Sequence, residues 1–558
     1  MILEGGMEME EAKNVGSFLN NVKKNNQFTL ASREKYFVDK SGIIDILNES
    51  VGKMERFICV TRPRRFGKSI NALMIASYYT KNLDMSDVFD KLKIAKCSSY
   101  KEHLNKHNVI YISFNTKNMK FNSYEEYRDF FIDGLVDDVR RICPDINPNA
   151  PISKIFDRAY YAGKRFIFVI DEWDYIFNNE MYTKDDRRNF LFFLEDLLKD
   201  KSYVELAYMT GILPIAKNSS GSSINMFKEY DFTNDAIYSK YFGFLEEEVE
   251  ELCKKQDKIT MQQLREWYDG YYTQEGDHIY NPRSVVYALQ DGRCQSYWTK
   301  TGKMKEVSNY INANIGGVKD EILAMLSGQE IPTTLGGFDA EAKASYKEKP
   351  KEERTKDLIL SGMTVLGFLS YYLPKETLEF YKTIGVEPNG RILKIPNKEL
   401  KLEFERIITS GDVGGLAEII TDSKDMLQAT IDKDEEKMAK ILEKIHKEHC
   451  SYFEYNKEIV LSFVVTTAYL YATTRYVIKK EDVEPMGRAD FAFYPIMPND
   501  TAFIIELKKD KTPEEAIEQI KDRKYFIPFK NFKGRKLLIG ITYDTKTEKH
   551  NVKIEELE

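Results

Sequence analysis

Cysteine is scarce in this sequence, and the few cysteines are scattered. Six occur among 558 residues, and no two form a Cys-x-x-Cys pair or a spacing typical of a zinc site. A small secreted scaffold needs a dense set of disulfides, and a zinc module needs paired ligands. The cysteine pattern therefore argues against both classes and fits a protein that folds in a reducing compartment.

Long apolar runs are also missing. The longest, such as residues 461–474, are too short and too rich in hydroxyl groups to cross a bilayer, which takes about 20 apolar residues. The first residues, MILEGGMEMEEAKN, lack the basic and then apolar pattern of a secretory signal. We expect a cytoplasmic protein that has no membrane partner.

The chain has no overall excess of positive charge, the feature that marks many nucleic-acid-binding proteins. Its 82 Lys and Arg residues against 89 Asp and Glu residues give a formal net charge of −7. One stretch has a local excess of positive charge, because it contains ten basic and six acidic residues between Glu506 and Lys536. A surface that binds DNA or RNA phosphates is expected there.

The length and the hydrophobic pattern predict several domains, the first of them α/β. A chain of 558 residues exceeds what one hydrophobic core usually supports, so two to four domains are expected. Helical periodicity, as in residues 124–139, alternates with short apolar stretches typical of buried strands. Such alternation predicts a parallel sheet. Its candidate strands are residues 57–61, 109–115, 166–170 and 203–209.

The stretch RFICVTRPRRFGKSINALMIA, residues 56–76, combines a strand, a turn and a helix. The turn ends in Gly67, Lys68 and Ser69. Glycine lets backbone N–H groups close on phosphate oxygens, lysine reaches the β- and γ-phosphates, and a serine hydroxyl ligates Mg²⁺. These residues predict an ATP site with bound Mg²⁺.

The turn departs from the usual phosphate loop at its start. Arg62 stands where the first glycine is normally found, and Arg65 follows three residues later. A loop with one glycine and several arginines is either a clamp for the charges of the nucleotide or merely a basic turn. We take Arg62 and Arg65 as candidate cofactor-binding residues.

A second strand supports the phosphate loop. Residues 166–170 are apolar and favour a buried strand, and Asp171 and Glu172 follow at its carboxyl end, where ligands bind in open α/β sheets. Asp171 is expected to hold Mg²⁺, and Glu172 to orient or deprotonate the attacking water. A pair of solvated acids at a strand end is the alternative. Thr210, after the next strand, is expected beside the γ-phosphate.

The order of the motifs resembles a known family, the bacterial AAA-ATPase-like proteins that carry a C-terminal PD-(D/E)XK nuclease-like domain. The resemblance covers about residues 31–545, and RPRRFGKS looks like the usual phosphate loop of that family. The matching motifs are YFVDKS (36–41), TRPRRFGKS (61–69), VIDEWD (169–174), TGILPIAK (210–217), FGFLEEEV (242–249), WYDGYY (267–272), YNPRSV (280–285), IPN (395–397), GRADF (487–491) and IELK (505–508).

The resemblance implies an α/β protein made of a P-loop NTPase with a parallel sheet, a helical and winged-helix-like lid, and an α/β restriction-endonuclease-like domain. In the lid, residues 358–372 are expected to form a helix, and residues 377–381 and 391–395 a β-hairpin. Four aromatic residues of the motif are expected to pack the lid against the core, with nucleobase stacking as the alternative: Trp267, Tyr268, Tyr271 and Tyr272. The expected boundaries are a tail at 1–30, an ATPase core at 31–245, the lid at 246–400, a helical connector at 401–450 and the nuclease-like domain at 451–558.

The last hundred residues hold the second chemical pattern. Asp490 opens one predicted strand, and Glu506 and Lys508 lie on one face of the next, because side chains alternate along a strand. Hairpin pairing would bring Asp490 beside them. Both carboxylates and the Leu507 carbonyl suit Mg²⁺, with Mn²⁺ as an alternative, and Lys508 can position the hydrolytic water.

This order of acids and lysine is the PD-(D/E)XK pattern, and the resemblance implies further site residues. Glu458 matches the additional acid of the family, and Gln519 and Tyr525 match its helix motif. A surface charge ladder across a hairpin is the alternative interpretation of Asp490, Glu506 and Lys508.

Two classes of function follow from these patterns. The first is an ATP-driven or ATP-gated, metal-dependent nuclease that acts on DNA or RNA. The second is a regulatory NTPase switch whose C-terminal domain binds nucleic acid or a protein without cutting it. Assembly into a homo-oligomer is compatible with both classes.

Overall fold

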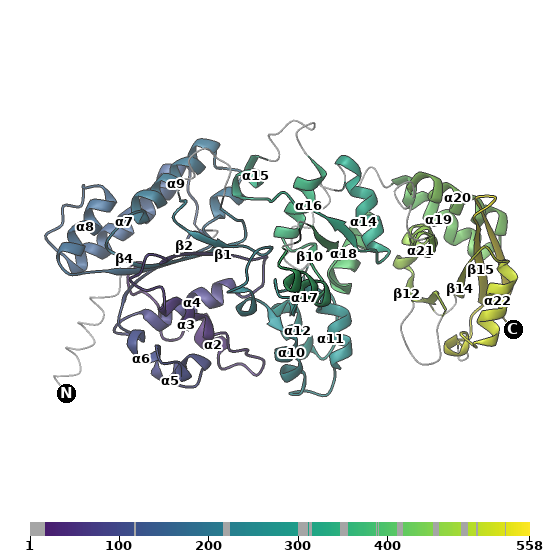
Figure 1. Cartoon of the computed structure of the whole chain (residues 1–558), viewed down its shortest axis with the longest axis horizontal. Coiled ribbons are helices and arrows are strands. Elements are labelled where there is room, and N and C mark those ends of the chain that lie inside the picture. Colours follow the sequence, from purple (N-terminus) through teal and green to yellow (C-terminus); the bar gives the residue numbers. More distant parts are fainter. Residues whose placement is uncertain are drawn as a thin grey trace. The chain divides into compact units, whose positions relative to one another are not determined.

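A computed structural model describes residues 17–116, 119–215, 224–298, 311, 315–345, 355–386, 388, 390–409, 417–449, 457–480, 489–497, 500–529 and 532–557. The chain divides into two compact units (Figure 1). The first comprises Met1–Tyr297 and Pro332–Asn397, and the second comprises Trp298–Ile331 and Lys398–Glu558. Among the described helices, none combines the length and the apolarity that a bilayer-spanning segment needs.

The first unit is built on a five-stranded sheet of order β2-β3-β4-β1-β5. Its paired strands all run parallel, which confirms the predicted parallel α/β sheet. Every residue of β1 and β3 is buried, because helices cover both faces of such a sheet. The strands are β1 (Phe57–Thr61), β2 (Asn108–Ser113), β3 (Phe166–Asp171), β4 (Val204–Gly211) and β5 (Lys228–Tyr230).

The helices of the sheet region lie on both of its sides (Figure 1), with α3 and α4 on one side and α7 and α9 on the other. Helix α7 begins where the Ser123 side chain accepts the Glu126 N–H, and α9 begins with a capping box of Thr183 and Asp186. The helices are α2 (Gln27–Ala31), α3 (Gly42–Asn48), α4 (Lys68–Tyr79), α5 (Ser86–Phe89), α6 (Tyr100–His103), α7 (Tyr124–Ile142), α8 (Ile152–Tyr161) and α9 (Lys184–Leu198).

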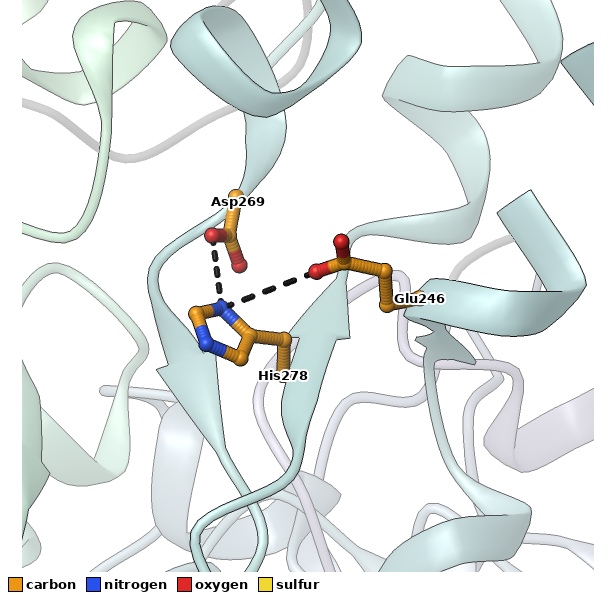
Figure 2. Close-up of side chains that lie close together, drawn as sticks. All are labelled: Glu246, Asp269 and His278. Carbon is orange, nitrogen blue, oxygen red and sulfur yellow. Dashed lines mark hydrogen bonds and ion pairs between the residues drawn. The ribbon is translucent and has the colours of Figure 1, made fainter. Parts of the chain in front are cut away.

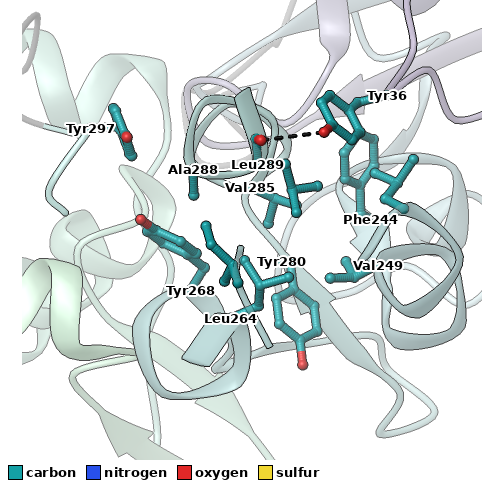
Figure 3. Close-up of a cluster of buried hydrophobic side chains, with 12 residues drawn as sticks. Tyr36, Phe244, Val249, Leu264, Tyr268, Tyr280, Val285, Ala288, Leu289 and Tyr297 are labelled. Atoms are coloured by element: carbon teal, nitrogen blue, oxygen red, sulfur yellow. Dashed lines mark hydrogen bonds between the residues drawn. The ribbon is translucent and has the colours of Figure 1, made fainter. Parts of the chain in front are cut away.

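A helical part follows the sheet in the first unit. It contains α10 (Glu246–Cys253), α11 (Met261–Tyr268), α12 (Pro282–Asp291) and a small antiparallel sheet of order β6-β8-β7, made of Phe244–Leu245, His278–Tyr280 and Tyr271–Tyr272. Its apolar cluster packs Tyr268 and Tyr280 against α10 and α12 (Figure 3). Tyr268 and Tyr271 are fully buried. Tyr268 lies in the same cluster as Tyr36, and Tyr271 packs edge-on against Phe66 of the phosphate loop with ring centres 5.1 Å apart, so the predicted packing against the core is confirmed for these two tyrosines.

The expected wing is only partly present. Strands β10 (Ser370–Tyr372) and β11 (Arg391–Lys394) form an antiparallel pair in a sheet of order β10-β11-β9, with β9 at Ile331–Thr333. The strand predicted at residues 377–381 is wrong, because these residues lie in α17 (Lys375–Ile384). Pro374 precedes this helix and Gly385, at φ 65°, ends it. The other helices of this region are α15 (Ala340–Ser345) and α16 (Lys356–Val365).

The second unit holds a mixed sheet of order β12-β13-β14-β15-β16. Strands β14 and β15 run parallel, joined through α22, and the other neighbouring pairs are antiparallel. The strands are β12 (Tyr476–Lys480), β13 (Phe491–Pro495), β14 (Ala502–Lys509), β15 (Lys536–Asp544) and β16 (Lys549–Glu556). The helices are α14 (Val318–Leu326), α18 (Lys398–Thr409), α19 (Ala417–Asp432), α20 (Glu435–His449), α21 (Lys457–Ala468) and α22 (Pro513–Asp522).

One glycine lets α22 approach this sheet. Gly540 lies in β15, directly across from Glu506 of β14. A Cβ at Gly540 would collide with the backbone carbonyl of Pro513, the first residue of α22. Ile517 and Ile520 of α22 pack on Ile504 of β14. The close contact places the polar side of α22 beside the end of β14.

The expected tail at residues 1–30 is in part an ordered edge of the first sheet. Leu19 forms an antiparallel bridge with Ile110 of β2. The buried carboxylate of Asp138, in α7, accepts the backbone N–H groups of Ser17, Phe18 and Leu19 at 2.7, 2.7 and 2.9 Å. Residues 1–16 lie outside the described residues. The segment after them is therefore held in two ways, by backbone hydrogen bonds to β2 and by the Asp138 side chain of α7.

Replacing Asp138 with Ala is expected to release this segment. Three N–H groups lose their acceptor, and each one left buried and unpaired costs about 1–3 kcal/mol. Hydrogen exchange should show faster exchange of the amides at residues 17–19, and the melting temperature of the first unit should fall. Asp137→Ala, at an exposed neighbouring position, serves as the control. Unchanged protection of these amides in Asp138→Ala would contradict this role of Asp138.

Candidate functional site

The phosphate loop leads from β1 into α4. Gly67 has φ 88°, a left-handed conformation that glycine adopts without strain, and it immediately precedes the helix. Lys68 is buried, and its Nζ donates to the Arg62 and Pro63 carbonyl oxygens at 2.9 and 2.8 Å. Burial lowers the pKa of Lys68 to about 8, and the nearby Asp174 carboxylate opposes that shift most. The loop thus holds a buried cation at a helix N-terminus.

The acidic end of β3 lies beside this loop. Asp171 is 3% exposed, and the Ser69 side chain hydrogen-bonds to it. Burial raises the pKa of Asp171 to about 6, and the hydrogen bond from Ser69 works against that shift. Only β4 separates β3 from β1 in the sheet. The structure therefore brings together Lys68, Ser69 and Asp171, as the sequence predicted.

Glu172 is held by a residue that sequence reasoning missed. Its backbone has φ 51°, an uncommon conformation for a residue with a side chain that costs about 1–3 kcal/mol. The Asn115 Nδ2 donates to Glu172 Oε2 at 2.5 Å. Asn115 follows β2, the neighbour of β3 in the sheet. Asn115 is the last residue of the strand predicted at 109–115 and lies two residues after β2 in the structure. A polar side chain at the carboxyl end of a predicted strand was the signal that could have identified it.

The Arg62 side chain is surrounded by partners from the protein itself. Its guanidinium is buried, donates to the Tyr230 carbonyl at 3.0 Å, and forms an ion pair with Asp235. It also lies over the Phe242 ring, 5.0 Å from the ring centre. These partners anchor the loop to β5 and the segment after it, and the cofactor-binding role of Arg62 stays a prediction.

Arg65 and Thr210 also have protein partners. Arg65 has φ 70° and donates from Nη1 to the Tyr297 carbonyl at 2.9 Å. The Thr210 hydroxyl, fully buried at the end of β4, donates to the Val60 carbonyl of β1 at 2.8 Å. Their roles toward a nucleotide stay predictions.

A third acid completes the end of β3. The two carboxylate oxygens of Asp174 accept the Ile212 and Leu213 N–H groups, each at 3.2 Å. The Trp173 Nε1 donates to the Leu213 carbonyl at 3.2 Å. A Cβ on Gly211 would lie 2.5 Å from Asp174 Oδ1 and from a Trp173 ring carbon, so only glycine fits there. Asp174 fixes the turn after β4.

In the second unit, the two predicted acids meet. Asp490 immediately precedes β13, and its Oδ2 accepts the Leu507 N–H at 2.6 Å. Glu506 is 2% exposed, and the Lys508 Nζ donates to Glu506 Oε1 at 3.0 Å. The Asp490 N–H donates to Glu506 Oε2 at 3.4 Å. The hairpin pairing predicted from the alternation of side chains is confirmed.

The predicted helix motif is also at this site. Gln519, in α22, donates from Nε2 to Glu506 Oε1, and Tyr525 packs against the apolar core beneath the helix. Glu458 lies in α21, as expected, but its side chain is outside the described residues. Two adjoining carboxylates and a backbone carbonyl form the oxygen-rich set that Mg²⁺ or Mn²⁺ prefers, so the residues present fit such an ion.

A further cluster in the first unit has the composition of a metal site. Ligand atoms of Glu246, Asp269 and His278 lie within 4.8 Å of one another (Figure 2). Arg265 Nε donates to Glu246 Oε1 at 2.8 Å, and His278 Nδ1 lies 2.7 Å from Asp269 Oδ2. The hydrogen bond to Asp269 raises the pKa of His278. We interpret the cluster as an ion-pair network that joins α10, the end of α11 and β8.

Two family models match the chain. Residues 25–220 match the model described as Predicted AAA-ATPase, and residues 456–553 match the PD-(D/E)XK nuclease superfamily. An uncharacterized protein in the vnfD 5′ region of Azotobacter chroococcum mcd 1 is 23% identical over 399 residues. That match covers 67% of this chain and 66% of the relative, just under two thirds of its length.

Two solved structures are similar at low identity. The ORC2 protein of Aeropyrum pernix is 11% identical, with 69% of this chain and 98% of that chain covered and a TM-score of 0.32. A Walker-type ATPase of Pyrococcus abyssi is 13% identical, with 65% and 95% covered and a TM-score of 0.33. These scores are too low to place the fold, which rests on the strand order given above.

The matched segments contain the two centres described here, with Lys68, Ser69 and Asp171 in the first and Asp490, Glu506 and Lys508 in the second. The resemblance drawn from the sequence motifs is confirmed. The chain carries a domain of the predicted AAA-ATPase-like family over residues 25–220, followed by a domain of the PD-(D/E)XK nuclease superfamily over residues 456–553.

Proposed function

We propose that the first unit binds and hydrolyses ATP and that the second unit is a metal-dependent nuclease acting on DNA or RNA phosphodiesters. One observation, common to both units, supports the proposal. In each unit a buried strand brings a carboxylate to a lysine, Asp171 near Lys68 and Glu506 beside Lys508. A lysine beside acids that can hold Mg²⁺ is the arrangement that phosphoryl transfer and phosphodiester hydrolysis require.

In the ATPase centre each side chain has a distinct task. Lys68 exchanges its loop carbonyl acceptors for oxygens of the β- and γ-phosphates, and Ser69 and Asp171 would hold Mg²⁺. The bound ion supplies positive charge to the phosphates. Glu172 orients the attacking water and takes its proton, and Asn115 keeps the carboxylate in place for that step.

In the nuclease-like centre Asp490, Glu506 and the Leu507 carbonyl would hold Mg²⁺ or Mn²⁺. The bound ion supplies Lewis-acid stabilisation of the phosphodiester oxygens. Lys508 positions the hydrolytic water and offsets negative charge as it develops. The Gln519 amide occupies Glu506 Oε1 and thereby sets the orientation of that carboxylate. These groups come from β13, β14 and α22, so the sheet itself fixes their geometry.

Loss of the loop lysine is expected to stop ATP hydrolysis. Lys68→Ala removes the cation aimed at the phosphates, and turnover should fall by at least about 100-fold, the usual scale for removing one transition-state contact. Glu172→Gln should keep ATP affinity and lose turnover. Hydrolysis and equilibrium binding are measured on the purified chain, with the exposed Lys53→Ala as control. Undiminished hydrolysis by folded Lys68→Ala protein would refute the ATPase proposal.

Divalent metal binding in the second unit is expected to depend on Asp490. Calorimetry with Mn²⁺ or Mg²⁺ on the full chain without nucleotide should show a binding event that Asp490→Ala loses, because one of two carboxylate ligands is gone. Metal-dependent cleavage of DNA or RNA should disappear with it. Asp522→Ala, exposed at the end of α22, is the control. Equal binding by Asp490→Ala would favour the charge-ladder interpretation.

Nucleic acid is expected to bind through phosphates and to vary little with sequence. Arg523, Lys524 and Lys533 are exposed in the segment after α22. Replacing each with Ala should flatten the dependence of affinity on salt by about 0.9 logarithmic units per lost contact with duplex phosphates. Metal binding should not change. A chain that binds neither DNA nor RNA at low salt would instead indicate a switch that acts on a protein partner.

A further inference from the structure

Several large apolar side chains are exposed among the described residues of the second unit. Among its described residues, the large hydrophobic side chains most open to solvent are Val477, Ile496, Met497 and Ile527, at 55, 60, 61 and 57% exposure. Single exposed apolar residues are normal on a protein surface, whereas a group of them marks an interaction site. Where these four lie relative to one another decides between the two cases.

All four are adjacent, across strands or along the chain, to a residue of one aromatic pair. Tyr494 of β13 stacks on Phe529, with ring centres 4.8 Å apart and an interplanar angle of 28°. Val477 of β12 is the direct cross-strand partner of Tyr494. Ile496 and Met497 follow Tyr494 in the chain, and Ile527 precedes Phe529 by two residues. We call Val477, Ile496, Met497 and Ile527 the apolar platform.

Val477 and its neighbour Tyr494 lie on the same face of the sheet as the two candidate metal-binding acids. Side chains alternate along β13, so Tyr494 and Asp490 point to the same face, and Val477 opposite Tyr494 does too. Helix α22 covers this face over β14 and β15. Ala492 and Tyr494 of β13 pack against the same buried core as Phe526 and Phe532 of the segment after α22. Val477 and Tyr494 therefore extend the face on which Asp490 and Glu506 lie.

Basic side chains lie around the platform. The Lys479 Nζ lies 5.8 Å from the centre of the Tyr494 ring. Arg523 and Lys524 are exposed just before Ile527, and Lys533 is exposed a few residues after Phe529. The nearby acid Asp500 is paired with Arg475 at 2.8 Å. An apolar surface with basic neighbours suits a partner that presents apolar faces between phosphates.

A paired duplex hides the faces of its bases in the stack, whereas an unpaired strand exposes them between its phosphates. We propose that the apolar platform binds unpaired nucleobases, so that the nuclease-like centre receives single-stranded DNA or RNA. The proposal rests on the nuclease function proposed above and names its substrate class. Bases pack on Val477 and Ile527, and the backbone passes Lys479 toward Asp490 and Glu506.

The test uses the full chain in Ca²⁺, which allows binding and suppresses cleavage, with a fluorescent unstructured oligonucleotide and its duplex. The double variant Val477→Ser/Ile527→Ser is expected to lose about tenfold or more in single-strand affinity, because each substitution removes apolar surface that the bases would bury. Its duplex affinity and its salt dependence should not change, because no charge is removed. Ile384→Ser, an exposed isoleucine in the first unit, is the control.

The outcomes distinguish a failure of the platform proposal from a failure of the nuclease proposal. Equal single-strand affinity of the double variant and the unchanged chain, or a preference of the unchanged chain for duplex, would overturn the platform and leave the nuclease proposal standing. A change in oligomeric state by light scattering, with nucleic-acid affinity unchanged, would show that a second copy covers the platform and would also overturn it. No binding to either probe by the unchanged chain would refute the nuclease proposal itself.

Discussion

Both candidate centres depend on the burial of charge at the ends of strands. Lys68, Asp171 and Glu506 are 8, 3 and 2% exposed. An ionised group taken out of water costs several kcal/mol unless the protein supplies partners in good geometry. Each group therefore fixes its neighbours: Lys68 holds two loop carbonyls, Asp171 accepts from Ser69, and Glu506 accepts from Lys508 and Gln519.

The same requirement joins distant motifs of the first unit. Arg62 in the phosphate loop pairs with Asp235, and Lys40 donates to Glu248 Oε2 at 2.6 Å and to the Lys240 carbonyl at 2.8 Å. These pairs connect the region around β1 to the helical part that follows the sheet. Removing one partner of a buried ion pair lowers the stability of the fold by more than the intact pair contributes to it, because the remaining charge is buried without a partner. Both motifs thus have a structural role in joining these segments.

The two centres differ in how the chain builds them. The phosphate-loop centre combines side chains from β2, β3 and α4, so it needs the complete parallel sheet. The nuclease-like centre needs only a hairpin, β13 and β14, and one helix over it. The platform beside that hairpin is open to solvent, whereas Glu506 is buried and Asp490 is half-buried.

Much of the local structure could be predicted from the sequence alone. An apolar run predicts a buried strand, and the predicted strand at residues 57–61 matches β1 residue for residue. The period of two along a strand likewise placed Glu506 beside Lys508. Such patterns work because backbone geometry repeats over a few residues. Where the pattern was short, at residues 377–381, Pro374 and Gly385 bounded a helix instead of the predicted strand.

The partners of buried polar groups were decided only by the tertiary structure. Asp235 lies 173 residues after Arg62, and Asn115 lies 57 residues before Glu172. Nothing in the local pattern connects such pairs, because they meet only after the strands have taken their order in the sheet. The residue types at the centres therefore follow from the sequence. The tertiary structure decides which partners these residues have. A buried charge is stable only beside a partner, and the fold determines which residues lie close enough to serve as one.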